Sequence, residues 1–272
     1  MFRERLISGI VLVAAALIFI LTGGPVLAVL LAVISVIGLN ELYRAIGVED
    51  QKFSPLAWVG YLGCVVYYMM VFWNQTAYTM TVLIALLILF MAVYVFTYPR
   101  YRTDQVTGAF FGIVYVVIML ACIYQLRAEK DGFYLVWLIF LASWGCDTCA
   151  YCVGVLFGKH KMSPKLSPKK SVEGAVGGVA GAALLGILYA LAVGDRLSGE
   201  VNYVLLFAVI CAAGALISMV GDLAASAIKR NHDIKDYGKL IPGHGGILDR
   251  FDSVIFIAPV IYYLVQGLIQ IF

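Results

Sequence analysis

The sequence predicts an all-α integral membrane protein with about nine transmembrane helices and a cytoplasmic N-terminus. Its 272 residues are 63% hydrophobic and only 13% charged, whereas about a quarter of the residues in a soluble domain carry a charge. Mean hydropathy is +0.96, and apolar stretches recur at about the 20 residues that a helix needs to cross the hydrocarbon core. These observations exclude an ordinary soluble protein.

The predicted spans follow one another through short connections and leave little chain for a soluble domain. The first, "MFRERLISGIVLVAAALIFIL", has the charged start and apolar centre of a signal peptide, but no A-x-A cleavage site follows it. We therefore expect it to be a retained first helix in one polytopic unit. The spans are expected near 6–22, 26–43, 56–73, 77–97, 106–126, 133–154, 174–193, 203–225 and 254–271.

Basic residues are distributed asymmetrically among the connections. With a cytoplasmic N-terminus, every lysine and arginine except Arg127, Lys130 and Arg196 faces the cytoplasm. Positive residues favour that side, so the asymmetry predicts nine spans with the C-terminus outside. The compact chain favours the cytoplasmic membrane of a bacterium. The net charge of +3 gives no reason to expect a nucleic-acid partner, and none is expected.

Polar chemistry gathers in two cytoplasmic connections, 155–173 and 226–253, each preceded by a span that carries an aspartate near its inner end. In the eighth span Asp222 lies roughly 29 Å along a helix that starts at Tyr203, where a core of about 30 Å ends. If the helix continues, Ser226, Lys229 and Arg230 share its face. A carboxylate with two cations beyond it suits a metal bound to a phosphate. An intrahelical ion pair with snorkelling basic side chains remains an equal alternative.

The stretch "IPGHGGILDRFDS", residues 241–253, precedes the last span. Glycines here can expose backbone N–H groups as an anion nest. Two carboxylates beside such backbone suit Mg²⁺ and a nucleoside triphosphate, because Mg²⁺ prefers oxygen ligands shared between protein and phosphates. Helix capping would explain one acid, and a lone histidine is more often structural, so His244 is taken as a supporting group. The candidate residues are Gly243, His244, Gly245, Gly246, Asp249, Arg250 and Asp252.

The stretch "WGCDTCAYCVGVLFGKHKMSPKLSPKKSVEGAVGG", residues 144–178, holds the other polar cluster. Asp147 lies roughly 21 Å from a helix start at Phe133, too deep for a helix-end charge, and intramembrane acids normally face protein or a watery cavity. Lys165, Lys169 and Lys170 follow in a proline-held loop. The alternative is a basic patch that is solvated or binds lipid headgroups.

Two further patterns in this stretch predict architecture. "GAVGGVAG", residues 174–181, contains overlapping G-x-x-x-G patterns that let helices pack closely. Cys146, Cys149 and Cys152 form one helical stripe inside a span. Packing is favoured over metal binding there, because buried charged ligands are costly.

The stretch "SAIKRNHDIKDYGKLIPGHGGILDRFD", residues 226–252, resembles the signature of the phosphatidate cytidylyltransferase (CDP-diacylglycerol synthase) family. The pattern Ser-x-apolar-Lys-Arg, then Lys-Asp, then His-Gly-Gly-x-x-Asp-Arg-x-Asp is filled at every fixed position. Upstream, "DTCAYCVG" and "SPKKSVEG" extend the resemblance over roughly the C-terminal half of the chain. It implies transfer of CMP from CTP to phosphatidate with Mg²⁺, and a potassium ion is associated with relatives.

The resemblance also implies roles for individual residues. Asp222 and Asp249 would form the metal-binding pair, Lys229 and Arg230 would meet phosphates, and His244 would support catalysis in the nucleotide loop. We expect a single transmembrane catalytic domain over 1–272, with N-terminal spans in 1–130 and the active site in 131–272, on the cytoplasmic side. A homodimer is expected. The substrate- and nucleotide-binding residues would be Asp147, Lys169, Lys170, Ser226, Gly245, Gly246, Arg250 and Asp252.

Two other functions compete with this interpretation. An anion transporter would use broken helices at the membrane midplane and inverted repeats, whereas the charged segments here gather at one face and no repeat is visible. A CTP-dependent polyprenol kinase would deliver the γ-phosphate and release CDP, so the nucleotide product distinguishes it.

Overall fold

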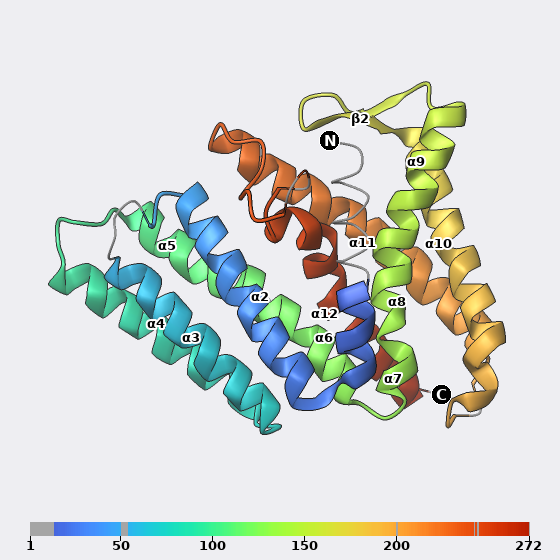
Figure 1. Ribbon diagram of the computed structural model, residues 1–272, viewed down its shortest axis with the longest axis horizontal. Helices are drawn as coiled ribbons and strands as arrows, with labels where there is room; N and C mark the ends of the chain where they lie inside the picture. Colours follow the sequence, from blue (N-terminus) through green and yellow to red (C-terminus); the bar gives the residue numbers. More distant parts are fainter. Residues whose placement is uncertain (1–13, 50–53, 200, 242, 244, 272) are drawn as a thin grey trace. The chain divides into compact units, whose positions relative to one another are not determined.

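The computed structural model describes residues 14–49, 54–199, 201–241, 243 and 245–271 (Figure 1). Seven helical segments in this part of the chain are long and apolar enough to cross a membrane. The prediction of an all-α polytopic membrane protein is therefore confirmed at that level. The seven segments are Gly24–Ala45, Pro55–Phe72, Thr76–Phe96, Thr103–Ala128, Gly132–Phe157, Val172–Arg196 and Tyr203–Asn231.

The first and last predicted spans are not among these seven. Of the first, residues 14–22 are helical, while 1–13 lie outside the described residues. The last coincides with α12 (Leu248–Ile271), a helix of 24 residues. The total of nine spans and the side of the N-terminus stay predictions.

The chain divides into two compact units, each built from two separate segments. The first unit comprises Met1–Tyr124 and His232–Arg250, and the second comprises Gln125–Asn231 and Phe251–Phe272. The expectation of a single catalytic domain, with its division after residue 130, stays a prediction.

The first unit is a group of helices around a buried tyrosine. Tyr43 has no exposed surface, and its hydroxyl donates a hydrogen bond to the carbonyl oxygen of Ala109 at 2.8 Å. Gly60 and Gly112 face its ring, where a Cβ atom would collide. The elements are α2 (Gly24–Ala45), α3 (Pro55–Phe72), η1 (Thr76–Tyr78), α4 (Thr79–Phe96), α5 (Thr103–Gly112), the π-helical η2 (Ile113–Ile118) and the start of α6 (Met119–Ala128).

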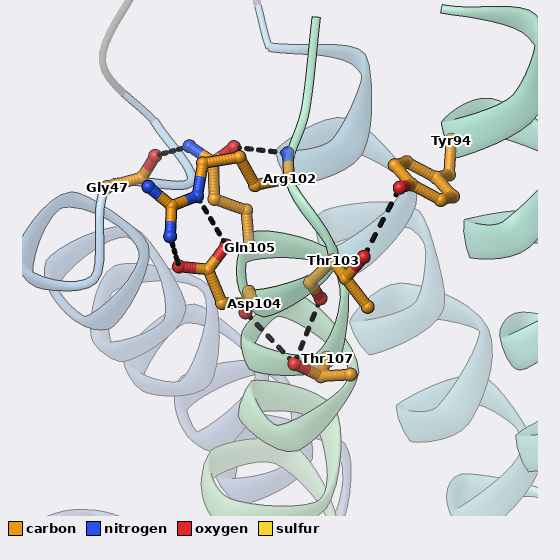
Figure 2. Close-up of polar contacts among 7 residues, drawn as sticks. All are labelled: Gly47, Tyr94, Arg102, Thr103, Asp104, Gln105 and Thr107. Atoms are coloured by element: carbon orange, nitrogen blue, oxygen red, sulfur yellow. Dashed lines mark hydrogen bonds and ion pairs between the residues drawn. The ribbon is translucent and has the colours of Figure 1, made fainter. Parts of the chain in front are cut away.

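Polar side chains fix the start of α5 (Figure 2). The backbone N–H of Arg102 donates to the Gln105 side chain at 2.9 Å, and the Gln105 amide donates to the carbonyl oxygen of Gly47. Arg102 also forms an ion pair with Asp104 at 3.1 Å. The first contact satisfies a backbone donor at the helix start, and the second ties α5 to the turn that follows α2.

The second unit contains the elements that carry most of the predicted site. Its long span Gly132–Phe157 is assembled from short helical pieces with a π-helical turn, η3, between them. The elements are α7 (Gly132–Leu135), α8 (Trp137–Phe140), η3 (Leu141–Gly145), α9 (Cys146–Phe157), β1 (Lys161–Ser163), β2 (Ser167–Ser171), α10 (Val172–Val193), η4 (Gly194–Arg196), α11 (Tyr203–Asn231) and α12.

Helices α9 and α10 lie side by side (Figure 1), and the glycines of α10 allow their close approach. A Cβ atom at Gly178 would lie 2.9 Å from the sulfur of Cys146, and one at Gly181 would lie 2.5 Å from that of Cys149. The predicted role of the glycine patterns in helix packing is confirmed. Two cysteines of the stripe thus pack against glycines of the neighbouring helix.

The proline-held loop before α10 is an antiparallel hairpin, β1–β2, rather than an irregular connection. Glu173 in the first turn of α10 accepts a hydrogen bond from the backbone N–H of Lys159 at 3.0 Å and contacts the His160 ring at 2.6 Å. Ser171 caps α10 by accepting the N–H of Gly174 at 3.1 Å. These anchors hold the ends of the hairpin, so its lysines are presented on ordered backbone.

Candidate functional site

In the second unit, two predicted site aspartates lie near each other where α11 and α12 make a close contact. Gly221 permits this contact, because a Cβ atom there would meet the backbone oxygen of Asp252 at 3.0 Å and the side chain of Phe256 at 2.8 Å. Asp222 follows in α11, and Asp252 lies within electrostatic range of it. Both side chains are part-buried, so repulsion between them is only partly screened by water.

Cations accompany this acid pair. Lys170, the fourth residue of β2, forms an ion pair with the Asp222 carboxylate. Lys229, two turns beyond Asp222 in α11, interacts electrostatically with Asp252, as does the more distant acid Asp147. The second unit therefore brings together residues that the sequence separates by up to 105 positions: Asp147, Lys170, Asp222, Lys229 and Asp252.

Carboxylate oxygens in such a cluster suit a hard divalent cation, and the adjacent ammonium groups suit the phosphates that would share it. Within the described ranges, no three or more His, Cys, Asp or Glu side chains form a ready metal site. The arrangement instead has acids and bases alternating, as expected where phosphate oxygens supply part of the coordination.

In the first unit, Asp249 organises the glycine-rich segment. Its Oδ2 atom accepts the backbone N–H of Tyr237 at 2.8 Å and that of Gly246 at 2.9 Å, and only 5% of the residue is exposed. Capping, which the sequence left open for one of the two acids, thus describes what Asp249 does here. These bonds do not exclude a metal role, since a carboxylate has about four lone-pair sites.

Gly245 meets two separate demands in this segment. Its φ of 86° lies in the left-handed region, which side chains other than glycine adopt only at a cost. A Cβ atom would also meet Asp249 Oδ2 at 2.7 Å. The backbone N–H of Ile241 donates to the carbonyl oxygen of Gly245 at 2.8 Å, which closes the turn. Gly243 also has a positive φ, 76°.

Arg250 carries a donor that the described chain leaves unsatisfied. Its Nε atom is buried and has no hydrogen-bond partner among the described residues. Because a buried charged donor without a partner is costly, this nitrogen fits an anionic ligand such as a phosphate.

The positions of the remaining predicted residues give less evidence about their roles. Lys169 is exposed on β2, Ser226 is half-buried one turn after Asp222, and Arg230 is exposed at the end of α11. His244 lies outside the described residues. Asp222 and Asp249, the predicted metal pair, belong to different units.

Glu41 in α2 is a site residue that the sequence reasoning missed. Its carboxylate accepts the backbone N–H groups of Ile247 and Leu248, each at 2.9 Å, although 206 and 207 positions separate the partners. The one available signal was an acidic residue close to the end of an otherwise apolar span, which is unusual enough to suggest function.

Comparison with known proteins decides the family. A model described as "Cytidylyltransferase family" matches residues 3–268. The chain belongs to this family. Three similar proteins are named phosphatidate cytidylyltransferase. That of Bacillus subtilis is 27% identical over 96% of this chain and 97% of its own, and that of Staphylococcus aureus is 30% identical over 96% and 98%.

The third, from Thermotoga maritima, is 32% identical over 60% of this chain and 62% of its own length. The family match spans the N-terminal half as well, whereas the motifs quoted from the sequence lie in roughly the C-terminal half. Glu41 therefore lies within the region that the family shares.

Proposed function

We propose that this cytidylyltransferase transfers CMP from CTP to phosphatidate, giving CDP-diacylglycerol and pyrophosphate. The observation that carries the proposal is the family match over residues 3–268, together with relatives of nearly equal length that are named for this reaction. In the second unit the paired acids and bases support binding of a polyanion with a cation. In the first unit the buried donor of Arg250 supports binding of an anion.

The reaction does not require a strong general base. The phosphomonoester of phosphatidate has its second ionisation near pH 6, as other phosphomonoesters do, so its oxygen is a nucleophile at neutral pH. It attacks the α-phosphorus of CTP, and the bond to the β-phosphate oxygen breaks with pyrophosphate as the leaving group. The protein must bring two anions together and neutralise charge in the transition state. Lys170, Lys229 and Arg230 would do so from β2 and α11, joined by Lys169 and Ser226.

Mg²⁺ would be held by Asp222 and Asp249, Asp252 would contribute to substrate binding, and a second ion, K⁺, is part of the proposal. The ion would supply charge neutralisation at the attacking and leaving oxygens. Oxygen ligands in this number suit Mg²⁺ rather than a soft metal. The segment with His244, Gly245 and Gly246 would form the nucleotide loop, where Arg250 would assist in binding the triphosphate, and Asp147 would line the site.

The membrane arrangement follows from the substrates. The acyl chains of phosphatidate stay in lipid while CTP arrives from the cytoplasm, so the polar ends of α11 and α12 would face the cytoplasm. We propose nine spans, a cytoplasmic N-terminus, residence in the cytoplasmic membrane and a homodimer. The excess of basic residues on that side supports this orientation.

Product analysis with two labels tests the proposed reaction. Purified protein in detergent receives phosphatidate, Mg²⁺ and CTP carrying label at either the α- or the γ-phosphate. Cytidylyl transfer puts the α-label into lipid and the γ-label into pyrophosphate, and chelation of Mg²⁺ stops both. Transfer of the γ-label to a polyprenol with release of CDP would establish a kinase instead. Label crossing sealed vesicles unchanged would indicate anion transport.

A further inference from the structure

Glu41 satisfies donors that helix α12 cannot satisfy from its own sequence. The first N–H groups of a helix have no partner within it. At the start of α12, the N–H groups of Ile247 and Leu248 donate to the two oxygens of Glu41, and the preceding N–H, that of Gly246, donates to Asp249. Three consecutive backbone donors are thus held by two carboxylates, one of which comes from a distant helix.

The Glu41 carboxylate is buried and closely packed. The residue is 7% exposed, and a Cβ atom at Gly238 or Gly246 would collide with its carboxylate. Asp249 is close enough to interact with it electrostatically. A buried carboxylate is expensive unless it accepts strong hydrogen bonds, so the backbone donors of the loop are what make an acid tolerable at this point of α2.

The same loop carries Gly245 and Gly246, which are proposed to form the nucleotide loop. Asp249 anchors it at Tyr237 and at Gly246, while Glu41 anchors the next two residues. Between these anchors the chain turns through Gly243 and Gly245, both with positive φ. Loss of the Glu41 contact would loosen the backbone that follows this turn, at Ile247 and Leu248, without removing any group that is proposed to touch the substrate.

We propose that Glu41 is a positioning residue: by capping α12 from α2 it holds the backbone at residues 245–248 in place and thereby sets the affinity for CTP. This inference rests on the proposed function, and it concerns nucleotide binding rather than phosphatidate binding or the chemical step.

The test compares Glu41→Gln with Glu49→Gln in the full-length protein. The glutamine of Glu41→Gln would keep one carbonyl acceptor but turn an NH₂ group toward the other backbone donor. Glu49 is a matched control in the same unit, because its carboxylate accepts only side-chain donors in the described contacts, from Asn40 at 2.7 Å and from Tyr61. Hydrogen exchange of peptides covering 245–250 and the separate KM values for CTP and phosphatidate are measured for each.

In Glu41→Gln we expect exchange at 245–250 to accelerate about tenfold and KM for CTP to rise about tenfold, the change expected from losing one buried hydrogen bond to a charged group. KM for phosphatidate and exchange in α11 should stay at the wild-type value, as should every quantity in Glu49→Gln. Should Glu41→Gln fail to fold, Glu41→Asp, with both acceptors one methylene shorter, replaces it with the same expectations.

Unchanged exchange at 245–250, or an equal rise in KM for both substrates, would overturn the proposal. Absence of cytidylyl transfer by the wild type would instead refute the proposed function. The exchange comparison would still decide whether Glu41 holds the loop, so the two failures are distinguishable.

Discussion

Asp249 is expected to have both a structural and a catalytic role, and two substitutions separate them. Both backbone donors, from Tyr237 and Gly246, use the same oxygen, Oδ2. Asp249→Asn can place its one carbonyl oxygen there and keep both bonds, losing only the charge assistance, about 1 kcal/mol per bond. Asp249→Ala leaves two buried N–H groups without an acceptor, at about 1–3 kcal/mol each, so it should cost about 2–6 kcal/mol.

Thermal unfolding and turnover of both variants, measured on the same detergent preparations, check this reasoning. We expect Asp249→Asn to lose about 2 kcal/mol of stability, the charge assistance of its two hydrogen bonds. Its kcat should fall about 100-fold or more, because the charge proposed to hold Mg²⁺ is gone. Asp249→Ala should be both inactive and clearly less stable. A fully active Asp249→Asn would refute the metal role, and an Asp249→Ala variant as stable as the wild type would refute the structural one.

Three further substitutions follow from the same contacts. Lys170→Met should change stability by no more than about 1 kcal/mol, because its ion pair with Asp222 is partly exposed, but lower kcat/KM about tenfold or more; wild-type kcat/KM would contradict this. Gly245→Ala should destabilise by at least about 1–2 kcal/mol, since its φ is 86° and the new methyl would meet Asp249; an unchanged unfolding midpoint would argue against that geometry. Asp147→Asn should lower turnover while the protein still reaches the membrane fraction, and unchanged turnover would remove Asp147 from the site.

Hydropathy located the helices well because span length is set by the membrane. The fifth span, expected at 106–126, is found at Thr103–Ala128, and the eighth, expected from Tyr203, begins there. The hairpin β1–β2 was not predictable in the same way. Its strands are short and contain proline and lysine, and anchors such as Glu173 hold its ends, so local strand propensity carries little of its stability.

In the candidate site, too, features set by neighbouring residues in the sequence could be predicted, whereas contacts between distant segments could not. Spacing along one helix was enough to group Asp222 with Ser226 and Lys229. The glycines of residues 241–253 indicated a backbone conformation that other residues rarely adopt, and Gly243 and Gly245 do have positive φ. Pairing between β2 and α11, as in the Lys170–Asp222 contact, depends on tertiary folding. The role of Glu41 could not be predicted from the sequence, because its partners are backbone N–H groups. Every residue except proline has such a group, so the partners leave no mark in the sequence.

The most direct test of the account is the stoichiometry of the reaction catalysed by the purified protein. CTP labelled at the α-phosphate is supplied with phosphatidate and Mg²⁺, and labelled lipid and pyrophosphate are counted in the wild type and in Asp249→Asn. The account predicts equal amounts of labelled CDP-diacylglycerol and pyrophosphate from the wild type, and neither from the variant. A folded wild-type preparation that puts no label into lipid would contradict it.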